Sequence, residues 1–171
     1  MGHPGAPRNP PDGDTHQMNL VAELPAGLTG LEQLQRMLAS GRSAPIGETL
    51  GFKLAAVEEG RVVFESVPGL HAYNPIGTVH GGYAATLLDS ACGCAAHSRL
   101  AANQGYTTLE LKVAYHRPMT ASTGPVRAEG RVLSIGRRAA FAEATITDAA
   151  GKLYASATST LLVFEREASG A

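Results

Sequence analysis

The sequence predicts an α+β fold in which an antiparallel sheet curls around one long, buried helix. Residues 83–100 form a run of Ala, Leu and other small residues that is interrupted by a single charged side chain before Arg99, which is typical of a helix buried in a core. Segments with strand-like alternation flank this run, and turn residues separate them. Two strands, a helix and then a series of hairpin-linked strands give the α+β pattern. The expected strands are residues 49–57, 61–67, 107–115, 126–135, 138–148 and 153–164.

Two of the strands show which side chains should face the core. Residues 126–135 place Arg127, Glu129 and Arg131 outward. Residues 107–115 alternate between an apolar face and a mixed one, so the apolar face is expected to pack inward. That apolar face consists of Leu109, Leu111, Val113 and Tyr115, against Glu110, Lys112 and Ala114.

Composition indicates a globular protein with one sizeable core. The chain has 171 residues, of which 44% are hydrophobic and 17% charged. A net charge of −1 gives no electrostatic reason to expect nucleic acid or an anionic membrane as a partner. There is no signal segment and no convincing membrane span, so we expect a cytoplasmic protein. Cys92 and Cys94 point about 200° apart on a helix, which predicts two unbridged core thiols.

The chain divides into an extension, one domain and a short tail. Residues 1–27 are rich in Pro and Gly and are expected to be disordered, whereas residues 28–165 form the folded domain and residues 166–171 a tail. Within the domain, residues 28–41 predict an N-terminal helix. Thr29 and Glu32 form a capping box, and Gly41 ends the helix. Its apolar face allows two interpretations, a lid over a site or a plain cover for the core; Leu31, Leu34 and Leu38 make up that face.

The turn-rich segment before the long helix carries the first functional signal. Gly81 and Gly82 stand at the expected helix start, where backbone N–H groups have no partner within the helix. Asp89 lies in the otherwise apolar middle of the helix, where an ionised carboxylate is costly without a reason. An exposed N–H can stabilise an oxyanion, and a carboxylate can attack a carbonyl or deprotonate water.

The spacing of these groups predicts a site shared between two chains. Gly81 and Asp89 are eight residues apart, about 12 Å along a helix. One helix therefore does not bring both groups to one atom. Two antiparallel copies do so if the first turn of one lies beside the middle of the other, and a two-fold dimer creates two such sites.

Taken together, the spaced motifs resemble those of the PaaI-like hotdog-fold thioesterases, relatives of the 4-hydroxybenzoyl-CoA thioesterases. The resemblance covers roughly residues 30–165. It depends on Asn74 seven residues before Gly81, on the His80-Gly81-Gly82 run, on Asp89, and on Thr108 through Arg117-Pro118. It implies a hotdog fold, homodimers that often pair into homotetramers, and hydrolysis of acyl-CoA thioesters without a metal or cofactor.

The resemblance also implies roles for individual residues. Asp89 matches the catalytic carboxylate, acting as nucleophile or general base, and Gly81 matches the glycine whose N–H polarises the thioester carbonyl. Asn74 matches the residue beside that carbonyl or the attacking water, and Thr108 a hydroxyl that holds water or substrate, although Thr107 is adjacent. Basic residues near the site mouth would meet the phosphates of CoA, together with Gly82 at the helix start; the candidates are Arg117, Arg137 and Arg138.

Each of these roles has a plainer alternative. The two glycines can serve a tight turn into the helix, and Asp89 can be satisfied by hydroxyls such as those of Thr86 or Ser90. His80 can orient the loop by a hydrogen bond or transfer a proton, and the arginines can be ordinary surface charge. At the level of function, a hotdog enoyl-CoA hydratase and a non-catalytic acyl-CoA-binding protein are the alternatives. Aryl and medium-chain acyl groups both remain open.

Overall fold

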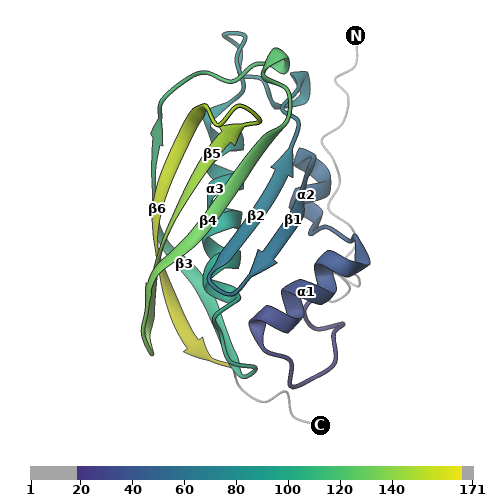
Figure 1. The fold of residues 1–171 in the computed structure, drawn as a ribbon, viewed down its shortest axis with the longest axis vertical. Coiled ribbons are helices and arrows are strands. Elements are labelled where there is room, and N and C mark those ends of the chain that lie inside the picture. The colour runs from purple at the N-terminus through teal and green to yellow at the C-terminus, as the bar shows by residue number, and fades with distance from the viewer. Residues whose placement is uncertain (1–18, 167–171) are drawn as a thin grey trace, which may run out of the picture.

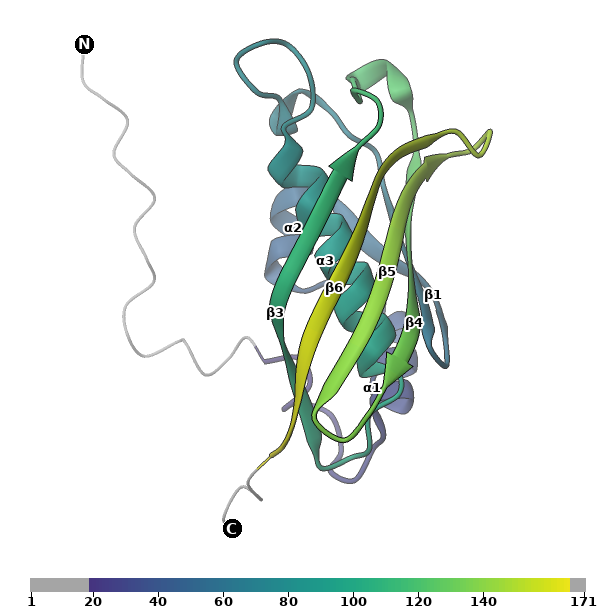
Figure 2. The same cartoon turned by 90° about the vertical axis from the view of Figure 1, so that its left-hand side faces the viewer.

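The α+β architecture is confirmed. A computed structural model describes residues 19–166. One antiparallel sheet of six strands, in the order β1-β2-β4-β5-β6-β3, wraps around helix α3 (Figures 1 and 2). The helices are α1 (Gly30–Ser40), α2 (Pro45–Leu50) and α3 (Gly81–His97), and the strands are β1 (Phe52–Glu58), β2 (Arg61–Ser66), β3 (Gln104–Tyr115), β4 (Val126–Ile135), β5 (Ala139–Asp148) and β6 (Leu153–Glu165).

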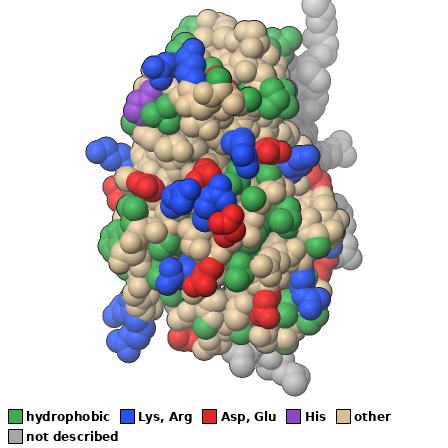
Figure 3. Space-filling model, in the orientation of Figure 1, with side chains coloured by type: hydrophobic (Ala, Val, Ile, Leu, Met, Phe, Trp, Pro, Cys, Tyr) green, Lys and Arg blue, Asp and Glu red, His purple; other side chains and the backbone are tan. Residues whose placement is uncertain are grey.

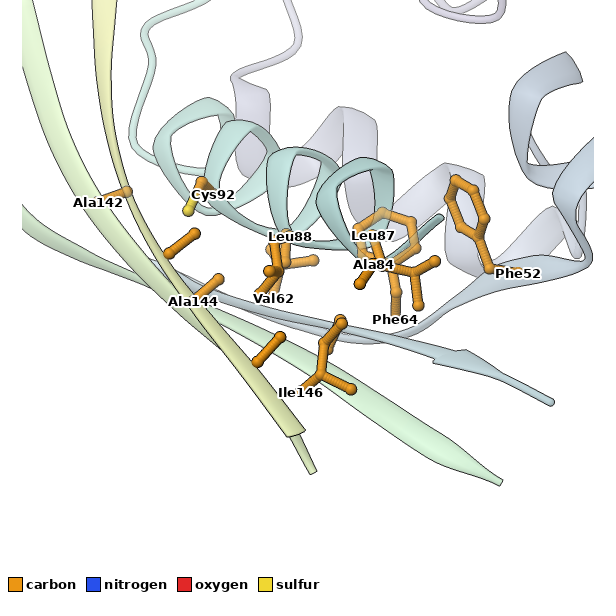
Figure 4. Packing of buried hydrophobic residues seen from close by; sticks show 14 of the residues in the cluster. Phe52, Val62, Phe64, Ala84, Leu87, Leu88, Cys92, Ala142, Ala144 and Ile146 are labelled. Atoms are coloured by element: carbon orange, nitrogen blue, oxygen red, sulfur yellow. The ribbon is translucent and has the colours of Figure 1, made fainter. Parts of the chain in front are cut away.

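Helix α3 lies against the inner face of the sheet and forms the centre of the core. Leu87 and Leu88 are fully buried and point toward the strands (Figure 4). The closest approach is to β4, where a Cβ added at Gly130 would lie 2.2 Å from the carbonyl oxygen of Ala91. A side chain at that position would push the helix off the sheet. Gly130 therefore fixes how deeply α3 sits, and with it every residue on the helix.

The boundaries of several elements differ from those that the sequence predicts; strand β3, for example, begins at Gln104 rather than residue 107. Helix α3 ends at His97 rather than residue 100, because Ser98 closes the last turn with hydrogen bonds to Cys94 and Ala96. The first strand begins at Phe52 rather than residue 49. Residues 45–50 are helical instead, since Pro45 opens a short helix and Gly51 ends it at φ 70°.

The outward face of the sheet carries paired charges, as the alternation in β4 predicts. Arg61 of β2 binds Glu129 of β4 at 2.6 Å and Glu58 of β1 at 2.8 Å. Arg131 binds the other oxygen of Glu129 at 2.6 Å. Figure 3 shows charges of both signs interleaved across this face.

Strand β3 departs from simple alternation, and the predicted inward positions of Leu109 and Tyr115 are wrong, since both side chains are exposed. Its register skips from Thr108 to Glu110 opposite β6, so Leu109 forms a β-bulge with 62% of its surface exposed. The extra residue shifts the phase of the strand. As a result Thr108 before the bulge and Leu111 after it are both half-buried, although strict alternation would place them on opposite faces.

Helix α1 is firmly attached to the end of α3. Its predicted capping box at Thr29 and Glu32 is confirmed, as is Gly41 at its C-terminus. The N–H of Gly30 donates to the carbonyl of Leu100 at 3.0 Å, and a Cβ at Gly30 would lie 1.8 Å from the His97 carbonyl oxygen. In Figure 1, α1 and α2 lie beside β1, away from the β6 side of the sheet.

The predicted extension and tail lie partly outside the described residues. Of the extension, residues 1–18 are not described, and residues 19–27 form turns. Glu23 in this segment makes an ion pair with Arg42, which follows α1. The backbone of Arg166 hydrogen-bonds to Asn103, and residues 167–171 are not described. Among the residues that the structure covers, none of the helices is long and apolar enough to cross a bilayer.

A buried polar contact holds α1 against α3. His97 is 5% exposed, and its Nε2 lies 2.9 Å from Oε1 of Gln33. An amide oxygen only accepts, so His97 donates from Nε2. Gln33 in turn donates to the carbonyl of Leu28 at 2.9 Å. Burial, with a smaller contribution from the charge of Arg166, lowers the pKa of His97 to about 4.

We therefore expect the free energy of unfolding to fall as the pH drops from about 6.5 to about 4. In this interval the unfolded chain binds a proton on His97 and the folded chain does not, which costs about 3 kcal/mol of stability in total. Urea unfolding across the interval measures the loss. The matched control is His97→Gln, which keeps a donor for Gln33 but does not titrate, and its stability should depend less on pH. Equal pH dependence in both proteins would contradict this assignment.

Candidate active site

The loop before α3 is closed by the side chain of Asn74. Its Oδ1 accepts hydrogen bonds from the N–H groups of Ile76 and Thr78, both at 3.1 Å. Its Nδ2 donates to Oγ1 of Thr78 at 2.9 Å, and Tyr73 pairs with Val79 across the loop. Within the chain, Asn74 thus holds the shape of the loop that leads into α3.

His80 caps the start of α3. Its Nδ1 accepts a hydrogen bond from the N–H of Gly82 at 2.8 Å, and its own N–H donates to the carbonyl of Ala72 at 2.7 Å. Because Nδ1 is the acceptor, a neutral His80 carries its proton on Nε2. This contact orients the loop, which is the first of the two roles considered for His80.

Tyr115 holds the same peptide unit from its other side. Its hydroxyl donates to the carbonyl of Gly81 at 2.9 Å. The peptide between Gly81 and Gly82 is therefore held at both ends, by a phenol on its C=O and an imidazole on its N–H. The sequence gives no sign of this contact, because Tyr115 comes from the far end of β3 and meets the loop only in the folded chain.

These two side chains also explain why residues 81 and 82 are glycines. A Cβ at Gly81 would lie 3.0 Å from the Tyr115 hydroxyl, and one at Gly82 would lie 3.0 Å from Nδ1 of His80. Neither glycine has a positive φ. Close packing of neighbouring side chains, rather than an unusual backbone conformation, accounts for both positions.

The first N–H of α3 points outward and is free to bind a ligand. The carbonyl of the same peptide, that of His80, accepts from the N–H of Tyr83 at 3.0 Å and so points into the helix. In a trans peptide the N–H of Gly81 points the opposite way, out of the N-terminus. Within residues 19–166 this N–H has no hydrogen-bond acceptor. It carries the partial positive charge of a helix start.

A hollow of about 320 Å³ lies in front of this helix start. Arg117 lies on its wall, and the Nη1 of that side chain donates to the carbonyl of Leu153 at 2.7 Å. We call this space the Gly81 hollow. Its lining comes from the loop, α3, β6 and the segment after β3, and consists of Val79, His80, Gly81, Ala84, Tyr115, His116, Arg117, Pro118, Met119, Tyr154 and Ala155.

Asp89 lies in a different hollow, halfway along α3. It is half-buried, and its Oδ1 accepts a hydrogen bond from Oγ1 of Thr108 at 3.0 Å. Thr107 is exposed, so of the two adjacent threonines it is Thr108 that faces the carboxylate. Thr86 donates to the carbonyl of Gly82 instead, at 2.9 Å. The partner of Asp89 thus comes from β3 and not from its own helix.

The space beside Asp89, here called the Asp89 cavity, has a volume of about 210 Å³. Cys94 and Tyr106 both lie on its wall. Burial raises the pKa of Cys94 to about 12, so at neutral pH it is a thiol and not a nucleophilic thiolate. Both cysteines are free, as predicted. Apolar side chains form much of the remaining wall, namely Leu34, Met37, Ala44, Ile46, Phe52, Leu54 and Phe64. Arg42, Ser43, Gly47, Lys53 and Ser90 line it as well.

The predicted site residues therefore fall into separate groups within one chain. Gly81 and Arg117 line one hollow, and Asp89 lines the other with Thr108. The exposed Arg137 and Arg138 lie in the turn between β4 and β5. This turn is at the opposite end of β5 from Arg117, about 30 Å away at the usual rise of a strand.

Comparison with known proteins identifies the family. The thioesterase superfamily model matches residues 76–155. This segment contains α3, and therefore the residues that α3 contributes to the Gly81 hollow and to the Asp89 cavity. The proofreading thioesterase EntH of Klebsiella pneumoniae is 30% identical over 103 residues, covering 60% of this chain and 74% of that protein. The chain belongs to the thioesterase superfamily. The PaaI-like hotdog resemblance carried by the spaced motifs is thereby confirmed.

Solved structures agree with this family membership. A variant of the phenylacetic acid degradation protein PaaI from Thermus thermophilus is 29% identical, with a TM-score of 0.63 over 69% of this thioesterase and 97% of that chain. A Streptococcus mutans protein bound to acetyl-CoA is 26% identical, with a TM-score of 0.62 over 68% of this chain and 92% of that one. The fold and the general chemistry, hydrolysis of a thioester, follow for this protein.

Proposed function

We propose that this thioesterase hydrolyses an acyl-CoA to a free acid and CoA in a site shared by two subunits. One chain supplies the Asp89 carboxylate, and its partner supplies the N–H of its own residue Gly81. The observation that carries the proposal concerns two groups in separate hollows, about 12 Å apart along one helix. One is a half-buried carboxylate, and the other is a helix-start N–H that has no acceptor within residues 19–166. The acetyl-CoA complex of the Streptococcus mutans protein supports CoA as the carrier.

The chemistry follows from these two groups. As general base, Asp89 takes a proton from water while the water oxygen bonds to the thioester carbon. As nucleophile, it attacks that carbon itself and forms an anhydride that water then hydrolyses. In either case the carbonyl oxygen becomes an oxyanion, which the Gly81 N–H stabilises. The C–S bond then breaks, and the CoA thiolate leaves and takes up a proton.

The neighbouring residues hold these groups in place. The Thr108 hydroxyl fixes one oxygen of Asp89 and leaves the other for the reaction. On the donor side, His80 and Tyr115 hold the peptide after Gly81, and Asn74 holds the loop. Asp89 and water suffice for this reaction, so we propose that it needs no metal or cofactor.

The proposed assembly is a two-fold homodimer with its α3 helices antiparallel, paired further into a homotetramer. A two-fold axis would place the first turn of one α3 beside the middle of the other. The two unbridged thiols suit a reducing cytoplasm. We further propose that Arg117 and Gly82 meet the CoA moiety near the helix start. Because Arg137 and Arg138 lie far from Arg117 in one chain, their contact with the same CoA would come from the other subunit.

The Asp89 cavity supports an aryl or medium-chain acyl group. An apolar cavity of about 150 Å³ is enough to hold benzene. The Asp89 cavity, at about 210 Å³, is somewhat larger and mostly apolar. It suits one ring or a short alkyl chain better than a long fatty acyl chain.

Replacing Asp89 tests the proposed chemistry. We expect Asp89→Asn and Asp89→Ala to lower kcat by at least about 10³-fold, because both remove the base or nucleophile. The matched control is Thr107→Val, which changes an exposed side chain next to Thr108. Thiol release from a panel of acyl-CoAs measures the rates, and size-exclusion chromatography checks assembly. Near-normal turnover by pure Asp89→Ala protein would overturn the assignment.

A pair of substitutions isolates the Gly81 N–H. Proline is favoured at the first position of a helix, and His80 at φ −63° and ψ 137° already has the conformation that proline requires of its predecessor. Both Gly81→Pro and Gly81→Ala add a Cβ beside the Tyr115 hydroxyl, but only the proline variant removes the N–H donor. We expect kcat of the proline variant to be about 10²–10³ lower than that of the alanine variant. Equal rates would exclude this N–H as a donor.

Hybrid dimers test whether the site is shared. Chains with Asp89→Asn and chains with Gly81→Pro carry different affinity tags and are co-expressed, and the hybrids are isolated by both tags. In a shared arrangement one site of each hybrid has an intact Asp89 and an intact Gly81, so activity should return to about half of the wild-type value per dimer. If each site belonged to a single chain, the hybrids would remain as inactive as their parents.

A further inference from the structure

We propose that α1 sets the upper size limit of the acyl group, with Met37 as the residue that determines it. This inference rests on the proposed function, because it assigns the Asp89 cavity to the acyl group of the substrate. It concerns residues 30–40, which precede the segment that matches the thioesterase superfamily. Family membership therefore says nothing about α1, and its role beside the Asp89 cavity has to be inferred from the fold of this chain.

The wall that α3 contributes to the cavity runs from Asp89, the proposed reactive end, to Cys94. At the reactive end, Asp89 is paired with Thr108. Five residues further along α3, about 7.5 Å at the helical rise, Cys94 lines the cavity together with Tyr106. An acyl group whose carbonyl is held beside Asp89 therefore extends along α3 toward Cys94, in the direction of the helix end to which α1 is attached.

Helix α1 contributes two apolar side chains to the wall at this point. Leu34 is 3% exposed and belongs to the core, so it is held by packing. Met37 is half-buried, packs against the core and lines the cavity. An unbranched thioether side chain adapts to the space around it, so Met37 can close the cavity without a polar contact to the substrate.

The attachment of α1 makes this wall fixed rather than a lid. Gly30 approaches the His97 carbonyl so closely that even a Cβ has no room, and its N–H is bonded to Leu100. One turn later Gln33 is bonded to the buried His97. Both contacts precede Leu34 and Met37 on the same short helix. Movement of α1 away from the cavity would break this buried hydrogen bond, which favours a wall whose backbone stays in place.

The test compares variants at two adjacent positions of α1 by their acyl-length profile. We expect Met37→Ala to raise kcat/KM for decanoyl-CoA relative to butyryl-CoA by at least about tenfold, because space for one methylene is worth that much in an apolar pocket. Met37→Trp fills the cavity and should shift the same ratio in the opposite direction. Leu38→Ala is the matched control, since Leu38 lies on the same helix but does not line the cavity.

The outcomes separate this inference from the proposed function. If the wild-type protein released CoA from none of the acyl-CoAs, the proposed function would fail. If it hydrolysed some of them but both Met37 variants kept the wild-type length profile, the proposed function would stand and the role of α1 would be overturned. An equal change in Leu38→Ala would also overturn it. Thermal unfolding confirms that each variant is folded at the assay temperature.

Discussion

The contact between Gly130 and Ala91 is the constraint on which the other positions depend. Because β4 has no side chain at Gly130, the backbone of α3 lies directly on the sheet, and this contact fixes the distance between helix and sheet. A helix held in this way is a rigid rod with a rise of about 1.5 Å per residue. The distance between the first turn of α3 and Asp89 then follows from the number of residues between them. The Gly81 N–H and the Asp89 carboxylate of one chain therefore cannot come closer together. A reaction that needs both the Gly81 N–H and the Asp89 carboxylate therefore requires the α3 helix of a second chain beside the first.

The two hollows suit different parts of one substrate. The Gly81 hollow has a helix start and Arg117, so it offers fixed partial charge and a cation. The Asp89 cavity has a hydrogen-bonded carboxylate and a thiol that burial keeps protonated. Apolar side chains form much of its wall, and Arg42 and Lys53 also line it. A thioester of CoA combines an anionic carrier, a polar carbonyl and an apolar acyl group. The proposed dimer would join the Gly81 hollow of one chain to the Asp89 cavity of the other.

Local patterns in the sequence predicted most of the fold. The capping box at Thr29, the helix end at Gly41 and the outward charges of β4 each depend on a few neighbouring residues, and the structure has them as expected. The α2 helix was missed because its six residues are too few to show a period. Tyr115 was missed as a contact of Gly81 for a different reason. The two residues are 34 positions apart, and only the folded chain brings them together.

The bulge at Leu109 shows how such an irregularity bears on the site. If β3 alternated strictly and Leu111 faced the core, Thr108 would face outward. Asp89 would then lose its hydrogen-bond partner. One extra residue resets the phase, so the strand can bury Leu111 and still present Thr108 to the carboxylate. The cost is an exposed leucine on the outside of an edge strand. No periodicity in the sequence reveals this arrangement, because the bulge breaks the very pattern by which strands are recognised. The position of Thr108 beside Asp89 is therefore a property of the sheet register.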